Sequence, residues 1–145
     1  MVDEVRILRL LRSLADDVSV LRSEAAAEEE RRADQMWLRG IKYAFVSAIE
    51  ASIDVAQHVC SSEGWGPPRD NGDAMLVLGR HGVLEPDLAQ RMRAAVGFRN
   101  VLVHQYGDVD DDIVLQRLTD LSDLDAYAGG IVRFLDSHGE APPRP

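Results

Sequence analysis

The sequence has little of what builds secreted or membrane-spanning proteins. Cys60 is the only cysteine, so the chain cannot form an intramolecular disulfide, which suits a reducing compartment. The first residues carry mixed charge from Asp3 onward and lack the apolar run of a secretion signal. No stretch approaches the roughly 18 uninterrupted apolar residues that a membrane span needs. We therefore expect a cytoplasmic protein that does not enter a membrane.

Motifs for nucleotide and metal binding are also missing. The segment Gly64-Trp65-Gly66 lacks a third glycine and a preceding strand, and no glycine-rich loop ends in Lys followed by Ser or Thr. The histidines and the cysteine show no spacing typical of zinc ligands. The aspartates between positions 108 and 112 fit the solvated start of a helix better than a cation site. The sequence thus predicts neither a bound metal nor a cofactor.

Aromatic residues make up only 6% of the chain, and no polar-apolar alternation is long enough for a strand. Leu, Ala, Glu and Arg are abundant, which favours helices. We predict an all-α fold, an up-and-down bundle of about five helices in one domain over residues 1–136. The remaining residues, 137–145, contain three prolines and are expected to be a disordered tail. The predicted helices cover about residues 3–24, 37–62, 70–80, 86–106 and 110–136.

Hydrophobic spacing and helix-end signals set these bounds. The first helix has apolar residues at alternating intervals of four and three, namely Ile7, Leu11, Leu14, Val18 and Leu21. The polar stretch 23–34 is either a solvated helix end or a turn between helices. The glycines and prolines of 64–68 end the second helix, and Pro86 falls in the first turn of the fourth. The core side of that fourth helix is expected to include Leu88, Met92, Ala95 or Val96, and Val103.

The balance of charge differs between the whole chain and one window of it. The net charge is −9, which argues against non-specific attraction to nucleic acid, because Lys and Arg drive phosphate binding. Between Arg80 and Tyr106, however, four arginines face only two acidic residues. Positive charge is therefore concentrated around the segment Arg99-Asn100-Val101-Leu102-Val103-His104-Gln105-Tyr106.

On a helix, this segment presents two polar lines. Arg99 and Tyr106 fall within roughly 20° of each other, while Asn100 and His104 form a second line one turn apart. Arg99 and His104 themselves are roughly 140° apart, so one helix cannot aim both at one atom. Two readings follow: the pair consists of ordinary surface residues near a helix end, or a two-fold dimer brings two copies together into a shared site.

The stretch from Gly97 to Tyr106 resembles the signature of HEPN-domain ribonucleases of the HepT toxin type. That signature has Arg, a polar residue, three mostly apolar residues, His, any residue and Tyr, and every position is matched. The resemblance implies a HEPN-like fold, a two-fold homodimer and an endoribonuclease toxin that needs no metal. It implies Arg99 and His104 as the catalytic pair and Asn100 as an orienting neighbour.

The chemistry of RNA cleavage fits such a pair. Attack by the 2′-hydroxyl needs a base, and departure of the 5′-oxygen needs an acid. Two protomers would supply two imidazoles, whose ordinary pKa near 6.5 suits either role, and two guanidiniums for the charge on the phosphorane. The resemblance further implies a partner, a nucleotidyltransferase antitoxin of the MntA type, which silences the toxin by adding AMP to Tyr106.

Other readings remain open at the level of sequence. The chain could be a non-catalytic helical partner of a nucleotidyltransferase, or an accessory subunit in which Tyr106 is only a modification site or an aromatic packed on the core. Trp65 could stack on an RNA base, although packing under its own loop is the simpler expectation.

Overall fold

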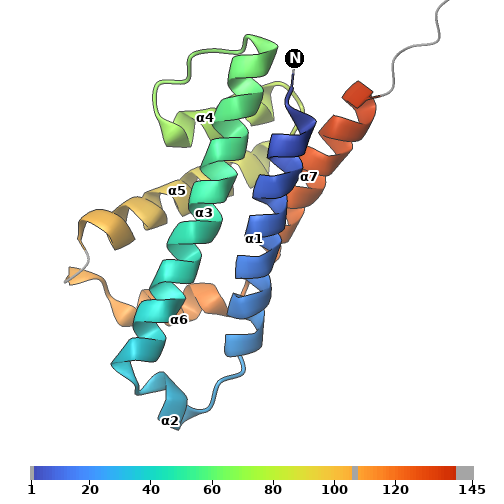
Figure 1. Ribbon diagram of the computed structural model, residues 1–145. Helices are drawn as coiled ribbons and strands as arrows, with labels where there is room; N and C mark the ends of the chain where they lie inside the picture. Colours follow the sequence, from blue (N-terminus) through green and yellow to red (C-terminus); the bar gives the residue numbers. More distant parts are fainter. Residues whose placement is uncertain (1, 106–107, 140–145) are drawn as a thin grey trace, which may run out of the picture.

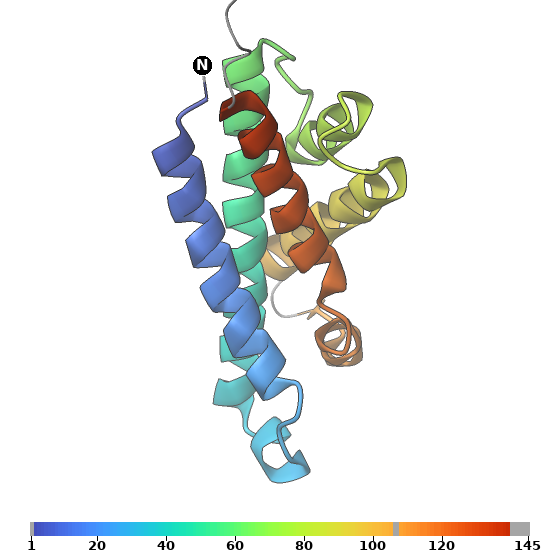
Figure 2. The ribbon, with the colours of Figure 1, turned by 90° about the vertical axis from the view of Figure 1, so that its right-hand side faces the viewer.

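The computed structural model describes residues 2–105 and 108–139, and over these residues it contains helices and no strand. The bounds are α1 Glu4–Glu24, α2 Glu29–Arg32, α3 Gln35–Glu63, α4 Asn71–Arg80, α5 Pro86–His104, α6 Asp111–Leu118 and α7 Ser122–Gly139. The long helices α1 and α3 lie side by side and run in opposite directions (Figures 1 and 2). Helix α7 packs against α1 and α5, and α5 crosses α3 obliquely. The predicted helical bundle is confirmed.

Side chains of aspartate start several of these helices. The carboxylates of Asp3, Asp34, Asp70 and Asp110 each accept a hydrogen bond from a backbone N–H in the first turn of the helix that follows. At the other end of α3, Gly64 adopts a φ of 71°, a left-handed conformation that glycine tolerates without strain. The end of α3 at Gly64 and the start of α6 among the aspartates follow the sequence signals, whereas α5 ends at His104, before its expected end at residue 106.

The predicted fifth helix is wrong, because it is two helices, α6 and α7. Between them, the Asp120 carboxylate accepts hydrogen bonds from the backbone N–H of Ser122 at 2.9 Å and from its hydroxyl at 2.6 Å. Such short-range bonds compete with helical ones and turn the chain. Leu118, Leu121 and Leu124 are all buried, so the apolar spacing continues across the break and hides it.

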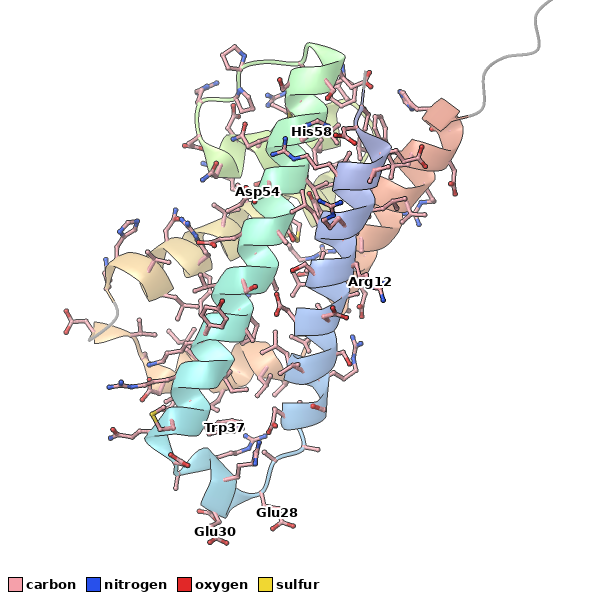
Figure 3. The ribbon with its side chains drawn as sticks, viewed as in Figure 1. Arg12, Glu28, Glu30, Trp37, Asp54 and His58 are labelled. Atoms are coloured by element: carbon pink, nitrogen blue, oxygen red, sulfur yellow. The ribbon has the colours of Figure 1, made fainter. Side chains whose placement is uncertain are left out.

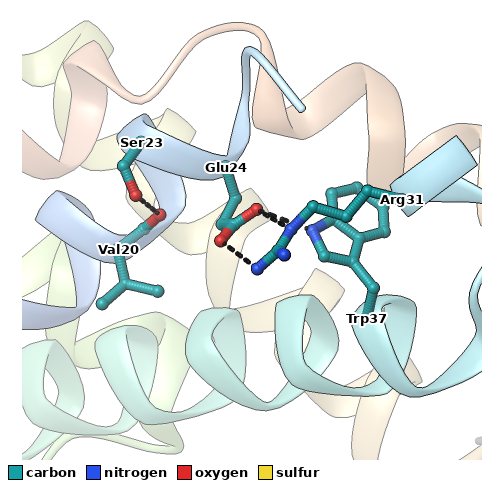
Figure 4. A network of polar contacts seen from close by, with 5 residues as sticks. All are labelled: Val20, Ser23, Glu24, Arg31 and Trp37. Atoms are coloured by element: carbon teal, nitrogen blue, oxygen red, sulfur yellow. Dashed lines mark hydrogen bonds and ion pairs between the residues drawn. The ribbon is translucent and has the colours of Figure 1, made fainter. Parts of the chain in front are cut away.

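The polar stretch 23–34 turns the chain from α1 into α3 and contains the short helix α2. Glu24 accepts two hydrogen bonds from Arg31, at 2.8 Å and 2.7 Å, and one from the Trp37 indole at 2.9 Å (Figure 4). These three residues, the Glu24 network, join the end of α1 to the start of α3. The hydrogen bonds from Arg31 and then Trp37 lower the pKa of Glu24.

Helix α7 continues to Gly139, so the predicted start of a disordered tail at residue 137 was wrong. The rest of that predicted tail, 140–145, lies outside the described residues. Within α7, Tyr127 is fully buried and its hydroxyl donates to the carbonyl of Ser52 on α3 at 2.6 Å. Among the residues described, no helix is both long enough and apolar enough to cross a membrane.

Candidate active site on helix α5

Helix α5 places Arg99 on its inner side, toward α3. The buried residues of α5 are Leu88, Ala89, Met92, Val96 and Leu102. Arg99 falls among their directions on the helical wheel, because it follows Met92 by seven residues, about two turns. Only 20% of its side chain is exposed. Val103, which we expected in the core, is 42% exposed, and Leu102 is buried in its place.

The Arg99 guanidinium is held by two neighbours. One terminal nitrogen, Nη1, donates to the side-chain oxygen of Asn100 at 2.9 Å. The other, Nη2, donates to Oε1 of Glu50 on α3 at 2.8 Å, which is also an ion pair. The third nitrogen, Nε, is buried and has no hydrogen-bond partner among the residues that the structure describes. Each terminal nitrogen keeps a second N–H that these bonds do not use.

His104 is the last residue of α5 and is exposed. Within the described part of the chain, its side chain makes no hydrogen bond or ion pair with Arg99 or with any other residue. The two side chains therefore leave the helix in different directions, as expected from their spacing. Asn100 is exposed like His104 and bonds Arg99 from the side. Tyr106, the fourth predicted site residue, lies outside the described residues.

The outer face of α5 next to His104 is formed by small and apolar residues. Ala94 and Gly97 are exposed, and Val101 is 38% exposed. A Cβ atom added at Gly97 would meet nothing within 4 Å, so this surface is open. We call the residues Ala94, Gly97, Val101 and His104 the α5 outer face. They lie one above another at intervals of three and four residues.

Other features of the molecule lie away from Arg99. Trp65 stacks on His81 at the end of α4, with ring centroids 4.1 Å apart, and meets Phe134 of α7 edge-on at 6.0 Å. Its ring contacts are therefore with these two helices, whereas we expected packing under its own loop. Trp65 follows the end of α3, about 20 Å along the helix from Glu50. No group of three metal-binding side chains is found among the residues that the structure describes.

Glu50 is a hydrogen-bond partner of Arg99 that the sequence did not indicate. It precedes Arg99 by 49 positions and sits in an unbroken helical pattern. Its neighbour Ile49 is buried in the core, while the Glu50 side chain is 48% exposed. Only the crossing of α3 and α5 brings the carboxylate to Arg99.

A family model described as "Ribonuclease HepT-like" matches residues 7–131. The chain belongs to the HepT-like ribonuclease family. This confirms the resemblance seen in the sequence, and a family of ribonucleases agrees with the expectation of an enzyme. The match covers α3, α5 and the whole of the segment 99–106.

Individual HepT-like proteins are similar over part of their length. The tRNA nuclease HepT of Aphanizomenon flos-aquae is 34% identical over 70 residues, 48% of this chain and 48% of that protein. The mRNA nuclease HepT of Shewanella oneidensis is 32% identical over 66 residues, 46% of this chain and 50% of that protein. The chain thus spans about half the length of these relatives in the matches.

The fold matches over a greater length. A solved structure of a tri-AMPylated HEPN toxin of Shewanella oneidensis in complex with an MNT antitoxin has a TM-score of 0.82, at 20% identity. The likeness covers 92% of this chain and 99% of that one. It shows that the HepT-like chain has the HEPN fold.

Proposed function

We propose that this protein is a metal-independent endoribonuclease, the toxin of a toxin–antitoxin pair. The observation that carries the proposal is the arrangement of Arg99 in a HepT-like chain. Asn100 and Glu50 fix its guanidinium, while an exposed His104, whose side chain bonds no other described residue, ends the same helix. A fixed guanidinium suits a phosphate, and a free imidazole suits proton transfer. The nuclease names of the similar proteins support the same activity.

The active site is a composite of two protomers. Arg99 and His104 of one chain leave α5 in different directions, so a second chain has to bring its His104 toward the shared phosphate. One imidazole takes the proton of the 2′-hydroxyl, the other protonates the departing 5′-oxygen, and the guanidiniums stabilise the phosphorane. The products are a 2′,3′-cyclic phosphate and a free 5′-hydroxyl.

The α5 outer face supports this pairing. Its exposed Ala94, Gly97 and Val101 carry little side-chain bulk, which lets two helices approach each other closely. Contact across a two-fold axis would place this face against its own copy. His104 lies at the end of the same face and would therefore reach the interface between the two chains.

The proposed regulator is a nucleotidyltransferase antitoxin of the MntA type, and Tyr106 is the proposed AMP acceptor. The toxin of Shewanella oneidensis with the same fold is described as tri-AMPylated and in complex with an MNT antitoxin. An adenylyl group two residues beyond His104 would put a negative phosphate and a bulky base where RNA enters. RNA and antitoxin would both be met in the cytoplasm.

Cleavage in EDTA by the purified protein tests the proposal. We expect cleaved RNA with 2′,3′-cyclic phosphate or 3′-phosphate ends, and we expect His104→Ala to abolish cleavage while the circular dichroism spectrum stays helical. His81→Ala is the matched control, because His81 is an exposed histidine that stacks on Trp65 far from Arg99. Equal cleavage by wild type and His104→Ala would contradict the assignment and favour a non-catalytic binding partner. Loss of all cleavage on metal removal would contradict metal independence.

A further inference from the structure

The contact between Glu50 and Arg99 joins two rigid elements of the core. Glu50 is part of α3, where the residues on either side of it in the helix, Ile49 and Ala51, are buried. Arg99 is part of α5, where Leu102, less than one turn further on, is buried. A side chain held between two packed helices has less freedom than one held by a loop. The position of the Glu50 carboxylate is therefore set by the crossing of α3 and α5.

We infer that Glu50 is a positioning residue of the ribonuclease site, which fixes the Arg99 guanidinium before RNA binds. The inference rests on the proposed ribonuclease function and deepens it. The carboxylate accepts from Nη2 at 2.8 Å, and Asn100 accepts from Nη1 at 2.9 Å, so the plane of the guanidinium is held at both ends. The second N–H of each terminal nitrogen stays available for phosphate oxygens.

Prior ordering of Arg99 has a physical benefit for catalysis. A long side chain loses rotamer freedom when it is ordered, and this loss opposes binding and catalysis. If the protein has already ordered Arg99, this cost does not fall on the transition state. A free arginine on the rim of the site would have to be ordered by the RNA itself.

The ion pair is poorly suited to a role in stability alone. The Glu50 side chain is 48% exposed, and ion pairs open to solvent contribute little to folding. The carboxylate also has a cost for an RNA-binding site, because it places a negative charge beside the phosphate-binding group in a chain of net charge −9. Ordering of Arg99 accounts for a carboxylate at this place.

Asp54 provides a matched control for the negative charge of Glu50. It lies on α3 one turn beyond Glu50, where Figure 3 labels it, and it is exposed. Among the described residues, Asp54 makes no hydrogen bond or ion pair. Asp54→Ala therefore removes the same charge from the same helix without touching Arg99.

The kinetic test compares Glu50→Ala, Glu50→Gln and Asp54→Ala with the wild type. We expect Glu50→Ala to lower kcat for RNA cleavage about 30-fold, since a small misplacement of a catalytic group costs up to about 100-fold. Glu50→Gln keeps an oxygen that accepts from Nη2, so its kcat should stay within about threefold of wild type. All three variants should show an equal or lower KM, because each removes a negative charge near the RNA. An equal kcat for Glu50→Ala and Asp54→Ala would overturn the inference, as would a rise of kcat in both Glu50 variants, which would make Glu50 a competitor for Arg99.

A second measurement does not depend on cleavage. The Arg99 Nε–H is buried, so its NMR signal, assigned through Arg99→Lys, should exchange slowly with water. We expect Glu50→Ala to speed this exchange at least tenfold, and Asp54→Ala to leave it unchanged. Unchanged protection in Glu50→Ala would overturn the inference even if cleavage were affected. If the wild type cleaves no RNA, the proposed function fails, and the exchange experiment still decides whether Glu50 orders Arg99.

Discussion

Two arginine–glutamate pairs in this molecule look alike but differ in which N–H donors of the arginine they leave unused. In the Glu24 network, Arg31 uses Nε and Nη2 in a two-pronged contact with one carboxylate, and Trp37 adds a third hydrogen bond. At Arg99, two separate acceptors hold the two terminal nitrogens, and Nε is buried with no hydrogen-bond partner in the described part of the chain. The Arg31 side chain is 61% exposed and the Arg99 side chain 20%.

The difference separates a structural pair from the pair that we propose to serve the active site. Glu24, which Arg31 binds, lies seven residues away in the sequence and helps to close a turn between helices, and both of its carboxylate oxygens accept hydrogen bonds. The packing of α3 against α5 brings Arg99 to Glu50. N–H groups of the Arg99 guanidinium remain without an acceptor among the described residues there, and an acceptor for them would be favourable. A negatively charged ligand at Arg99 would gain from donors that the protein itself leaves unused.

The largest expected effect comes from replacing each arginine by lysine. Arg99→Lys keeps the positive charge but loses the planar fork, so we expect RNA cleavage to fall about 100-fold. Arg31→Lys should leave the rate of cleavage within about twofold of wild type and lower only the melting temperature. Initial rates on a defined RNA at saturating concentration measure the cleavage by both variants. If the two variants had equal rates, the contrast between the pairs would have no functional meaning.

A smaller effect concerns the pH dependence of the Glu24 network. The pKa of Glu24 is lowered in the folded chain, so its contribution to stability is present above the ordinary value of 4.5 and is lost as pH falls through the lower folded value. Glu24→Gln should lower the melting temperature by about 3 °C at pH 7. This difference should shrink as the pH falls below 4.5 and vanish in stronger acid.

Glu28→Gln is the control for that comparison, because the Glu28 side chain is exposed and, among the described residues, bonds no partner. Its melting temperature should follow the wild type across the pH range. A pH-independent difference between wild type and Glu24→Gln would show that the Glu24 carboxylate is not perturbed by Arg31 and Trp37.

The smallest effect tests whether an unpartnered buried atom is enough to mark a functional site. Asp17 Oδ2 is, like Arg99 Nε, buried without a hydrogen-bond partner among residues 2–105 and 108–139. Burial raises the pKa of Asp17, and Asp16 adds to the rise while Ser47 opposes it. The ionised carboxylate therefore destabilises the folded chain, and stability falls as pH rises from 3.8 through the higher folded value.

Asp17→Asn should raise the melting temperature by about 2 °C at pH 7, with a gain that disappears in acid, and should leave RNA cleavage unchanged. Asp16→Asn, the exposed neighbour, should show a smaller gain. A loss of cleavage in Asp17→Asn would mean that the unpartnered atom of Arg99 is not what distinguishes the site.

Local signals in the sequence predicted most of the fold. The buried residues of α1 are the five that the apolar spacing indicates. Pro86 stands in the first turn of α5, and Gly64 ends α3, as their backbone preferences require. The break between α6 and α7 escaped prediction because apolar spacing records which face is buried and not whether the helix is continuous. Hydrogen bonds from Ser122 to Asp120 make the break, and in the sequence these two residues look like any other polar residues.

Only those features of the candidate site that depend on α5 alone could be predicted from the sequence. Helical geometry placed Arg99 and His104 in different directions, and the structure agrees. It could not reveal Glu50, because nothing in the pattern of α3 distinguishes this glutamate from its exposed neighbours. The roles of Arg99, Asn100, His104 and Tyr106, and the dimer, remain predictions.

The direction in which the His104 side chain leaves α5 has a consequence for the protein concentration at which the proposed toxin would become harmful. Each chain orders its own Arg99 through Glu50, but in the proposed dimer a second chain must supply the other imidazole. Well below the dissociation constant, the concentration of dimer grows with the square of the concentration of single chains. A few copies from leaky expression would then cleave almost nothing, and a modest burst of synthesis would cross into toxicity. The geometry of one helix end would thus give the cell a threshold.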